Sequence, residues 1–318
     1  MIWLKQIRPI HIIILSVIVY AIFIAISDFQ DSLSILLHFP ILLFAVMLIC
    51  ALINYLIRFV KWHYYLKIID VKIPVKKSLL IFLAGFSMTI TPGKSGELIK
   101  SHLLCKDGYP ISHTSPVVFA ERLTDLFGMI ILALIGGIAF GFSPLPLLIL
   151  LVLLGIVVII VQYEPLALRT LILLNKLPMI SKHNEKIERL YFSSRVLTHG
   201  KPLSFGIVLS VISWLFECIC LYIALLGIGM PVPILTAVFI FAFSTIAGII
   251  AMLPGGLGAT EAVMMALLAK TGVPLADATA ATLLARLATL WFAVGIGMVV
   301  LAYLEKQGSE KKVEDTNS

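Results

Sequence analysis

Seven ionisable side chains lie inside stretches of the chain that are otherwise apolar: Glu97, Glu121, Arg122, Asp125, Glu217, Glu261 and Arg286. Charge in such surroundings is costly to bury and commonly functional. An arginine keeps its charge, and its planar guanidinium suits a phosphate group. Arg122 and Arg286 therefore predict a binding site for an anionic, phosphate-bearing headgroup.

The same charges also allow a purely structural interpretation. Glu121 and Asp125 are four residues apart on one helical face, and Asp125 follows Arg122 by three. Glu97 or Glu261 could reach either arginine. The two interpretations hold together if a substrate phosphate replaces a carboxylate as the partner of an arginine.

Three further polar residues are candidates with open roles. Glu217 is either a proton-coupling acid or a hydrogen-bonded packing residue. Arg58, four residues after Asn54, either extends to lipid phosphate at the membrane interface or joins the site, and we favour the interface. Lys94 stands in a Pro-Gly turn and is a candidate ligand for the headgroup.

The sequence shows no motif for a metal, a cofactor or ATP. The seven histidines and four cysteines have no metal-ligand spacing, so we expect no metal and no cofactor. No phosphate-binding Walker motif occurs, so ATP hydrolysis is not expected to drive the protein.

These residues need a membrane scaffold, because 60% of the 318 residues are hydrophobic and only 13% are charged. A soluble domain is about 25% charged. We predict an all-α polytopic membrane protein, a single domain over residues 1–304, with about six spanning helices: 10–27, 40–60, 115–141, 145–162, 203–227 and 278–304.

Two other apolar segments, 79–105 and 233–272, are each interrupted by a Pro-Gly run. Proline removes a helical donor and glycine frees the backbone, so each segment predicts two short helices around a turn. We interpret both as re-entrant hairpins, although 233–272 is long enough for two full crossings. The predicted hinge residues are Pro92, Gly93, Gly96, Pro254, Gly255, Gly256 and Gly258.

The positive charges orient this topology. Of the 24 Lys and Arg residues that contribute to the net charge of +7, 19 fall in the predicted inner segments, and the predicted outer loops hold none. We therefore expect both termini in the cytoplasm and the protein in the cytoplasmic membrane. The basic linker 163–202 predicts amphipathic helices on anionic lipid, and the polar tail 305–318 predicts disorder. No nucleic-acid partner is expected.

The chain also repeats itself. Pro92-Gly93-Lys94-Ser95-Gly96 matches Pro254-Gly255-Gly256-Leu257-Gly258, and Gly108-Tyr109-Pro110 matches Gly272-Val273-Pro274. Arg122 and Arg286 each follow the second motif by 12 residues. In the expected topology the two copies, about 40–141 and 203–304, enter from opposite sides. Such inverted-topology repeats are typical of transporters with a site at the repeat interface.

Three motifs resemble the transmembrane region of the lysylphosphatidylglycerol synthase family, also called flippase-like. They are the segments 91–98, 121–125 and 253–261, and the resemblance extends over nearly the whole chain. It implies movement of modified phospholipids between leaflets. The aminoacyl-transferring members of the family carry a further soluble domain, which does not follow here, so we do not expect lysyltransferase activity.

Three functions are compatible with these observations. The leading hypothesis is a flippase-type translocase, not an enzyme, for an anionic phospholipid or a polyprenyl-phosphate-linked lipid. The second is a membrane-embedded lipid-phosphate transferase with Glu97 or Glu261 as general base. The third is a non-catalytic membrane subunit of a separate lipid-modifying enzyme.

Overall fold

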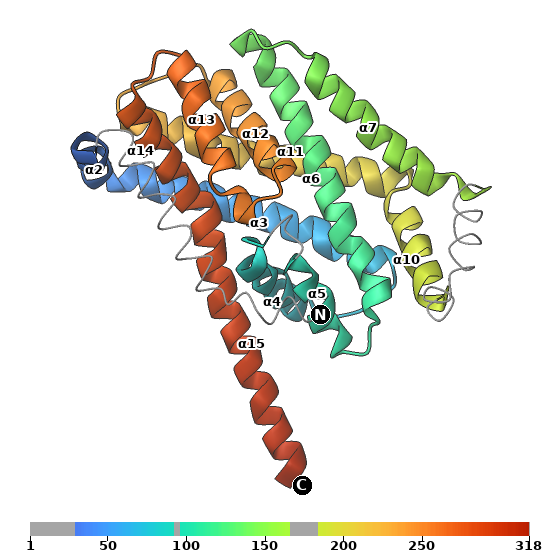
Figure 1. Cartoon of the computed structure of the whole chain (residues 1–318). Helices are drawn as coiled ribbons and strands as arrows, with labels where there is room; N and C mark the ends of the chain where they lie inside the picture. The colour runs from blue at the N-terminus through green and yellow to red at the C-terminus, as the bar shows by residue number, and fades with distance from the viewer. Residues whose placement is uncertain (1–28, 92–95, 166–183, 318) are drawn as a thin grey trace.

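The computed structural model describes residues 29–91, 96–165 and 184–317, and these residues form helices joined by short turns (Figure 1). Five helices in this part of the chain are long and apolar enough to cross a membrane: α3 (Ile41–Ile68), α6 (Ile111–Phe140), α7 (Leu145–Gln162), α11 (Gly200–Gly227) and the continuous helix Leu275–Gln307. Five of the six predicted spans are therefore confirmed as helices. The sixth, 10–27, lies outside the described residues.

The last of these helices has three parts. α14 (Leu275–Arg286) passes through a π-helical turn, η5 (Leu287–Trp291), into α15 (Phe292–Asn317). A π-helical turn inside an α-helix is rare and often marks a functional position. Here it follows directly after Arg286.

The shorter helices flank the Pro-Gly runs or join the spans: α2 (Phe29–Leu37), α4 (Val75–Gly85), the 3₁₀ turn η2 (Phe86–Met88), α5 (Ile99–Cys105), α10 (Asn184–Leu197), α12 (Ile234–Ile250), the 3₁₀ turn η4 (Pro254–Gly256) and α13 (Ala259–Lys270). Both apolar segments are thus broken where the sequence predicts. The helices of the first, with 11 and 7 residues, are about 17 and 11 Å long at 1.5 Å per residue. Neither is long enough to cross a bilayer core of about 30 Å.

The two helices that carry the central arginines begin in the same way. Pro110 is the N-cap of α6, Pro274 is the N-cap of α14, and a left-handed glycine stands two residues before each proline. Proline suits this position because its fixed φ extends the chain without a free amide. Arg122 and Arg286 both lie 11 residues after the first residue of their helix.

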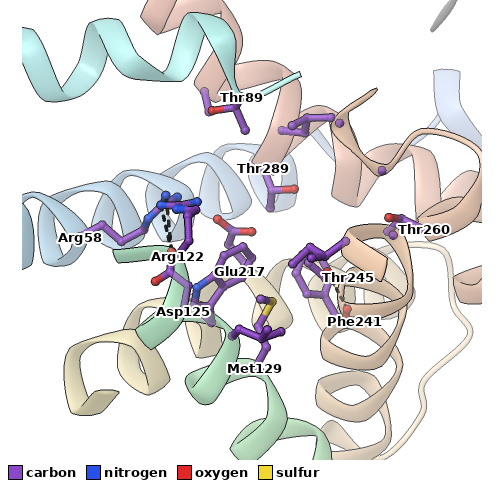
Figure 2. Close-up of a pocket in the computed structure, with 18 of the residues that line it drawn as sticks. Arg58, Thr89, Arg122, Asp125, Met129, Glu217, Phe241, Thr245, Thr260 and Thr289 are labelled. Carbon is purple, nitrogen blue, oxygen red and sulfur yellow. Dashed lines mark hydrogen bonds and ion pairs between the residues drawn. The ribbon is translucent and has the colours of Figure 1, made fainter. Parts of the chain in front are cut away.

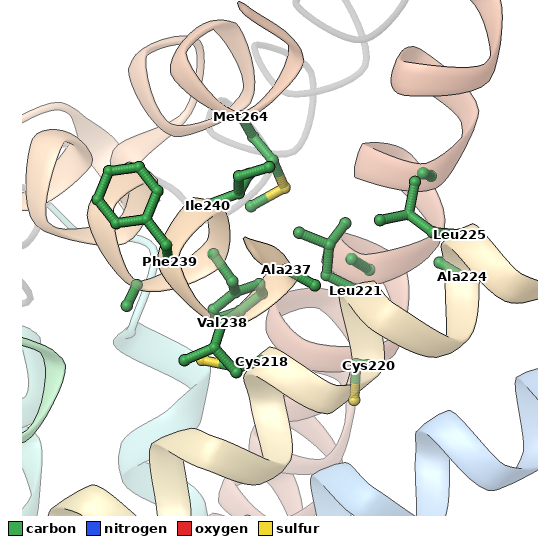
Figure 3. Packing of buried hydrophobic residues seen from close by; sticks show 14 of the residues in the cluster. Cys218, Cys220, Leu221, Ala224, Leu225, Ala237, Val238, Phe239, Ile240 and Met264 are labelled. Carbon is green, nitrogen blue, oxygen red and sulfur yellow. The ribbon is translucent and has the colours of Figure 1, made fainter. Parts of the chain in front are cut away.

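The main apolar core lies between α11, α12 and α13, with α6 and α14 around them. Figure 3 shows how it is built: Leu221 of α11 lies beside Ala237 of α12, Cys218 lies beside Val238, and Met264 of α13 packs on Ile240. Small side chains let these helices approach closely, as is common between membrane helices. A second apolar cluster around Trp62, Tyr65 and Phe82 joins α3 to α4 and α6.

The structure describes the basic linker 163–202 in part and the tail 305–318 almost completely. In the linker 163–202, α10 is a helix that packs against α6, and residues 166–183 lie outside the described part. The backbone of 305–317 continues α15 as a helix, whereas the sequence predicts a disordered tail there. Its Glu, Lys and Gln residues are good helix formers, and they extend a helix already started in the membrane.

Candidate functional site

A cavity of about 340 Å³ lies between the long helices, and residues from both broken segments contribute to its wall. Its ionisable lining consists of Arg58, Arg122, Asp125, Glu217 and Arg286. The structure therefore brings the two sequence-predicted arginines to one cavity. Figure 2 shows Arg58, Arg122 and Asp125 close together, with Glu217 beside them.

Arg122 contacts two carboxylates. Its Nη1 lies 3.1 Å from Oε1 of Glu97, and its Nη2 lies 3.0 Å from Oδ2 of Asp125. The arginine side chain is 20% exposed, whereas Glu97 and Asp125 are almost completely buried. The Arg122 side chain thus reaches the cavity, which Asp125 also lines and Glu97 does not.

Each of these carboxylates also holds a buried lysine. The Nζ atom of Lys100 is 3.1 Å from Glu97 and 2.6 Å from Glu121, and it lies 4.7 Å from the ring centroid of Trp62. Aromatic faces stabilise such a cation. Gly85 leaves room for this lysine, because a Cβ at that position would lie 2.7 Å from Cδ of Lys100.

The second buried lysine, Lys61, donates to Oδ1 of Asp125 at 2.5 Å and to the hydroxyl of Ser210 at 2.7 Å. Asp125 is therefore shared by Lys61 and Arg122. Removing one partner from a buried ion pair is strongly destabilising, because the other charge is left uncompensated. A carboxylate with two cations keeps one when the other leaves.

Arg286 is bound differently. Its Nε donates to Oε1 of Glu261 at 2.7 Å, and its Nη2 donates to the carbonyl of Gly255 at 2.7 Å. Oε2 of Glu261 accepts the amide of Gly258 at 2.8 Å, which caps the start of α13. Arg286 and Glu261 together fasten the broken turn to the neighbouring span.

This second turn requires glycine. Gly255, Gly256 and Gly258 have φ values of 62, 69 and 87°, a region that L-residues adopt at a cost of about 1–2 kcal/mol. A Cβ on Gly256 would also lie 2.6 Å from Oγ1 of Thr260. The predicted hinge is thus a tight turn with a defined shape.

The first turn is described only in part, because Pro92, Gly93 and Lys94 lie outside the described residues. The amide of Gly96 donates to Oγ1 of Thr91 at 2.7 Å. The two broken segments meet beside the cavity: Ile90 packs against Leu257, and a Cβ on Gly255 would lie 3.5 Å from Cα of Ile90.

Arg58 is a site residue that the sequence analysis placed at the membrane interface, and Lys61 is one that it did not single out. Arg58 is 5% exposed, lies 3.8 Å from Asp125 and stacks over the rings of Phe86 and Trp214. It does not extend to the membrane interface, because α3 continues to Ile68 and carries both cations inside the protein. The spacing of Arg58 and Lys61 could have indicated this position, because both lie on the same helical face as Asn54.

The structure also places the two other predicted acidic residues, Glu121 and Glu217. Glu121 is fully buried and accepts Lys100, and Glu217 of α11 lines the cavity at 7% exposure. Five threonines complete the polar lining: Thr89, Thr91, Thr245, Thr260 and Thr289. Within residues 29–91, 96–165 and 184–317, no group of three or more His, Cys, Asp or Glu side chains is arranged to hold a metal ion.

Fold and site together define a multi-pass α-helical membrane protein with a charged cavity between its spans. The family model of the lysylphosphatidylglycerol synthase transmembrane region matches residues 13–297. The chain belongs to this family, as its motifs indicated.

Archaeal relatives with the family name UPF0104 match most of the chain. A UPF0104 membrane protein of Methanothermobacter thermautotrophicus is 28% identical over 260 residues, which cover 74% of this chain and 77% of the relative. A UPF0104 membrane protein of Pyrococcus horikoshii is 25% identical over 289 residues, covering 82% and 86%. One of Methanocaldococcus jannaschii is 24% identical over 274 residues, covering 79% and 82%.

Proposed function

We propose that the protein is a flippase-type lipid translocase that moves an anionic phospholipid or a polyprenyl-phosphate-linked lipid between leaflets. The observation that carries this proposal is the position of Arg122, whose side chain is partly exposed and lines a cavity between the spans. Charged groups at this depth commonly mark a substrate pathway. The headgroup phosphate binds Arg122, while the hydrocarbon chain stays in the membrane.

The ion pairs support Arg122 as the exchangeable partner. When Arg122 turns from Glu97 and Asp125 to a phosphate, Glu97 retains Lys100 and Asp125 retains Lys61. The cost of breaking the buried pairs is therefore reduced. Arg286 contacts the second turn twice, at Glu261 and at the carbonyl of Gly255, so its departure would break both contacts with the turn. Arg286 accordingly shapes the cavity and adds positive charge to it.

The charge balance favours an anionic ligand. In the network around Arg122, four cations (Arg58, Lys61, Lys100, Arg122) face three carboxylates (Glu97, Glu121, Asp125), a surplus of 4 − 3 = 1 positive charge. Glu217, beside this network in the cavity, offsets the surplus when it is ionised. A bound phosphate would replace that negative charge, and we propose Glu217 as the residue that couples headgroup binding to a gradient.

The broken segments supply the movement. We infer that α4–α5 and α12–α13 are re-entrant hairpins of two inverted-topology repeats, with both termini in the cytoplasm. Their contact at Ile90 and Leu257 and the matching positions of the two arginines support this arrangement. Rocking of one hairpin against the other would expose the cavity to each leaflet in turn.

A sidedness assay tests the proposed function. Protein reconstituted into liposomes should increase the accessibility of an inner-leaflet labelled phosphatidylglycerol or phosphatidate to an external quencher, relative to protein-free liposomes. A zwitterionic lipid with the same chains serves as the control and should move more slowly. Equal rates for anionic and zwitterionic lipid, or no increase over protein-free liposomes, would contradict the proposal.

A further inference from the structure

We infer that the cavity opens sideways, between α6, α7 and the turn before η4, and that a hydrocarbon chain of the bound lipid leaves through this opening. We call the opening, formed by Phe119, Val157 and Leu253, the apolar mouth. The inference rests on the proposed function, because it takes the lipid whose headgroup binds Arg122 as the occupant.

The exposure of the lining residues carries the inference. Phe119 is 50% exposed, Leu253 is 43% and Val157 is 38%, although all three line the cavity. The charged groups of the lining are less exposed: four of them lie between 2 and 7%, and the side chain of Arg122 is 20% exposed. The cavity is therefore apolar where it meets the surface and charged where it is enclosed.

The depth of the apolar mouth identifies its surroundings. Phe119 lies eight residues after the start of α6, and Val157 lies 12 residues after the start of the 18-residue α7. These positions are about 12 and 18 Å along their helices. Both lie within the stretch that crosses the bilayer core of about 30 Å. The mouth consequently faces hydrocarbon and not water.

α7 is suited to form one side of such an opening. Leu147 is its single buried residue, and a Cβ on Gly155 would meet no atom within 4 Å. At its end, Gln162 Nε2 donates to the carbonyl of Arg195 at 2.8 Å and to the hydroxyl of Thr198 at 2.9 Å. The helix is thus fixed where it joins α10 and lightly packed along its length (Figure 1).

The chemistry of the cavity selects an amphiphile. Phenylalanine, valine and leucine at the mouth offer no hydrogen bonds to a sugar, a phosphate or water. A hydrocarbon chain can lie against these side chains without leaving apolar surroundings. Leu126, Met129 and Leu154 add further apolar side chains to the wall of the same cavity. Head and tail of one lipid therefore find matching surfaces in one continuous space.

Photolabelling with phosphatidate that carries a diazirine in its acyl chain tests this inference on the reconstituted full chain. In the parent protein, the label should reach peptides with Met129 and Trp214, which line the cavity. Val157→Trp should abolish most of this labelling, because the larger side chain fills the mouth. Ile159→Trp is the matched control, because Ile159 is 65% exposed on the same helix and does not line the cavity.

Leu253→Trp narrows the same mouth from another segment. It replaces Val157→Trp in the test if that variant does not fold. Labelling confined to the outer surface of the parent, or unchanged labelling of Met129 in both tryptophan variants, would overturn the inference. The two proposals fail separately: lipid movement without cavity labelling overturns the apolar mouth alone. Cavity labelling without lipid movement overturns the translocase and supports the mouth.

Discussion

Arg122 lies 3.1 Å from Glu97, the residue 122 − 97 = 25 positions before it. Arg286 and Glu261 are paired at 2.7 Å across the same separation of 25 residues. In both pairs the glutamate lies near the start of the second helix of a broken segment, and the arginine lies in the span that follows. The two pairs occupy equivalent positions in the sequence, but different groups surround them. We therefore expect the loss of each arginine to change stability by a different amount.

Arg286→Ala should lower stability more than Arg122→Ala does. The first leaves Glu261 and the Gly255 carbonyl without Arg286, and breaking a buried pair costs about 3–5 kcal/mol. Thermal unfolding in detergent, followed by tryptophan fluorescence, measures the difference. Arg195→Ala, which breaks an exposed pair with Glu164, is the control and should cost about 1 kcal/mol or less. A midpoint for Arg286→Ala equal to that of the control would contradict the turn-fastening role.

Lys100→Met should also destabilise the protein, by about 3–5 kcal/mol, because it leaves Glu97 and Glu121 buried together without this cation. Adding Glu121→Gln removes one of the two charges and should restore part of the loss. Lys77→Met, at an exposed pair with Asp107, is the matched control. If the second substitution adds to the first with no recovery, Lys100 and Glu121 are not energetically coupled.

Two alanine variants of the glycine turn distinguish backbone strain from a steric clash. Gly258→Ala places a Cβ in open space at a φ of 87° and a ψ of −56°, so it should cost backbone strain alone, about 1–3 kcal/mol. Gly256→Ala adds a contact of 2.6 Å with Thr260 and should cost more. Unfolding midpoints of the two variants, measured side by side, check the order; the reverse order would show that this turn is not shaped as described.

Glu217→Gln should remove the effect of a proton gradient on lipid movement. An amide cannot take up a proton when the phosphate enters, so movement that depends on this exchange loses its response to an imposed pH difference. The rate in liposomes with and without a pH difference is the measurement. A response in Glu217→Gln as large as in the parent would assign coupling to another group or to none.

Much of the scaffold follows from sequence because span length, Pro-Gly breaks and apolar runs act locally. The positions of Arg122 and Arg286 within their helices follow from the same rules. The pairing of Arg122 with Glu97 and of Arg286 with Glu261 needs the tertiary fold, since the sequence allowed each glutamate to reach either arginine.

Arg58 and Lys61 could not be assigned by a rule that counts positive charges near the ends of spans. That rule treats both as interface residues, whereas the 28-residue α3 carries them inward to Asp125. Burial of a cation depends on whether an acid stands opposite it, and Asp125 comes from another helix. Such a cluster is therefore visible only once α3 and α6 are packed together.

The central claim is that Arg122 holds the headgroup in transit, and lipid sidedness in liposomes tests it most directly. Loss of one charge-assisted contact, about 1.5–3 kcal/mol, should slow movement of labelled anionic lipid in Arg122→Ala by about 10-fold or more. Arg189→Ala, at an exposed pair with Glu185 on α10, should leave the rate at the parent value. Lipid movement in Arg122→Ala as fast as in the parent, in protein that is folded and equally reconstituted, would contradict the claim.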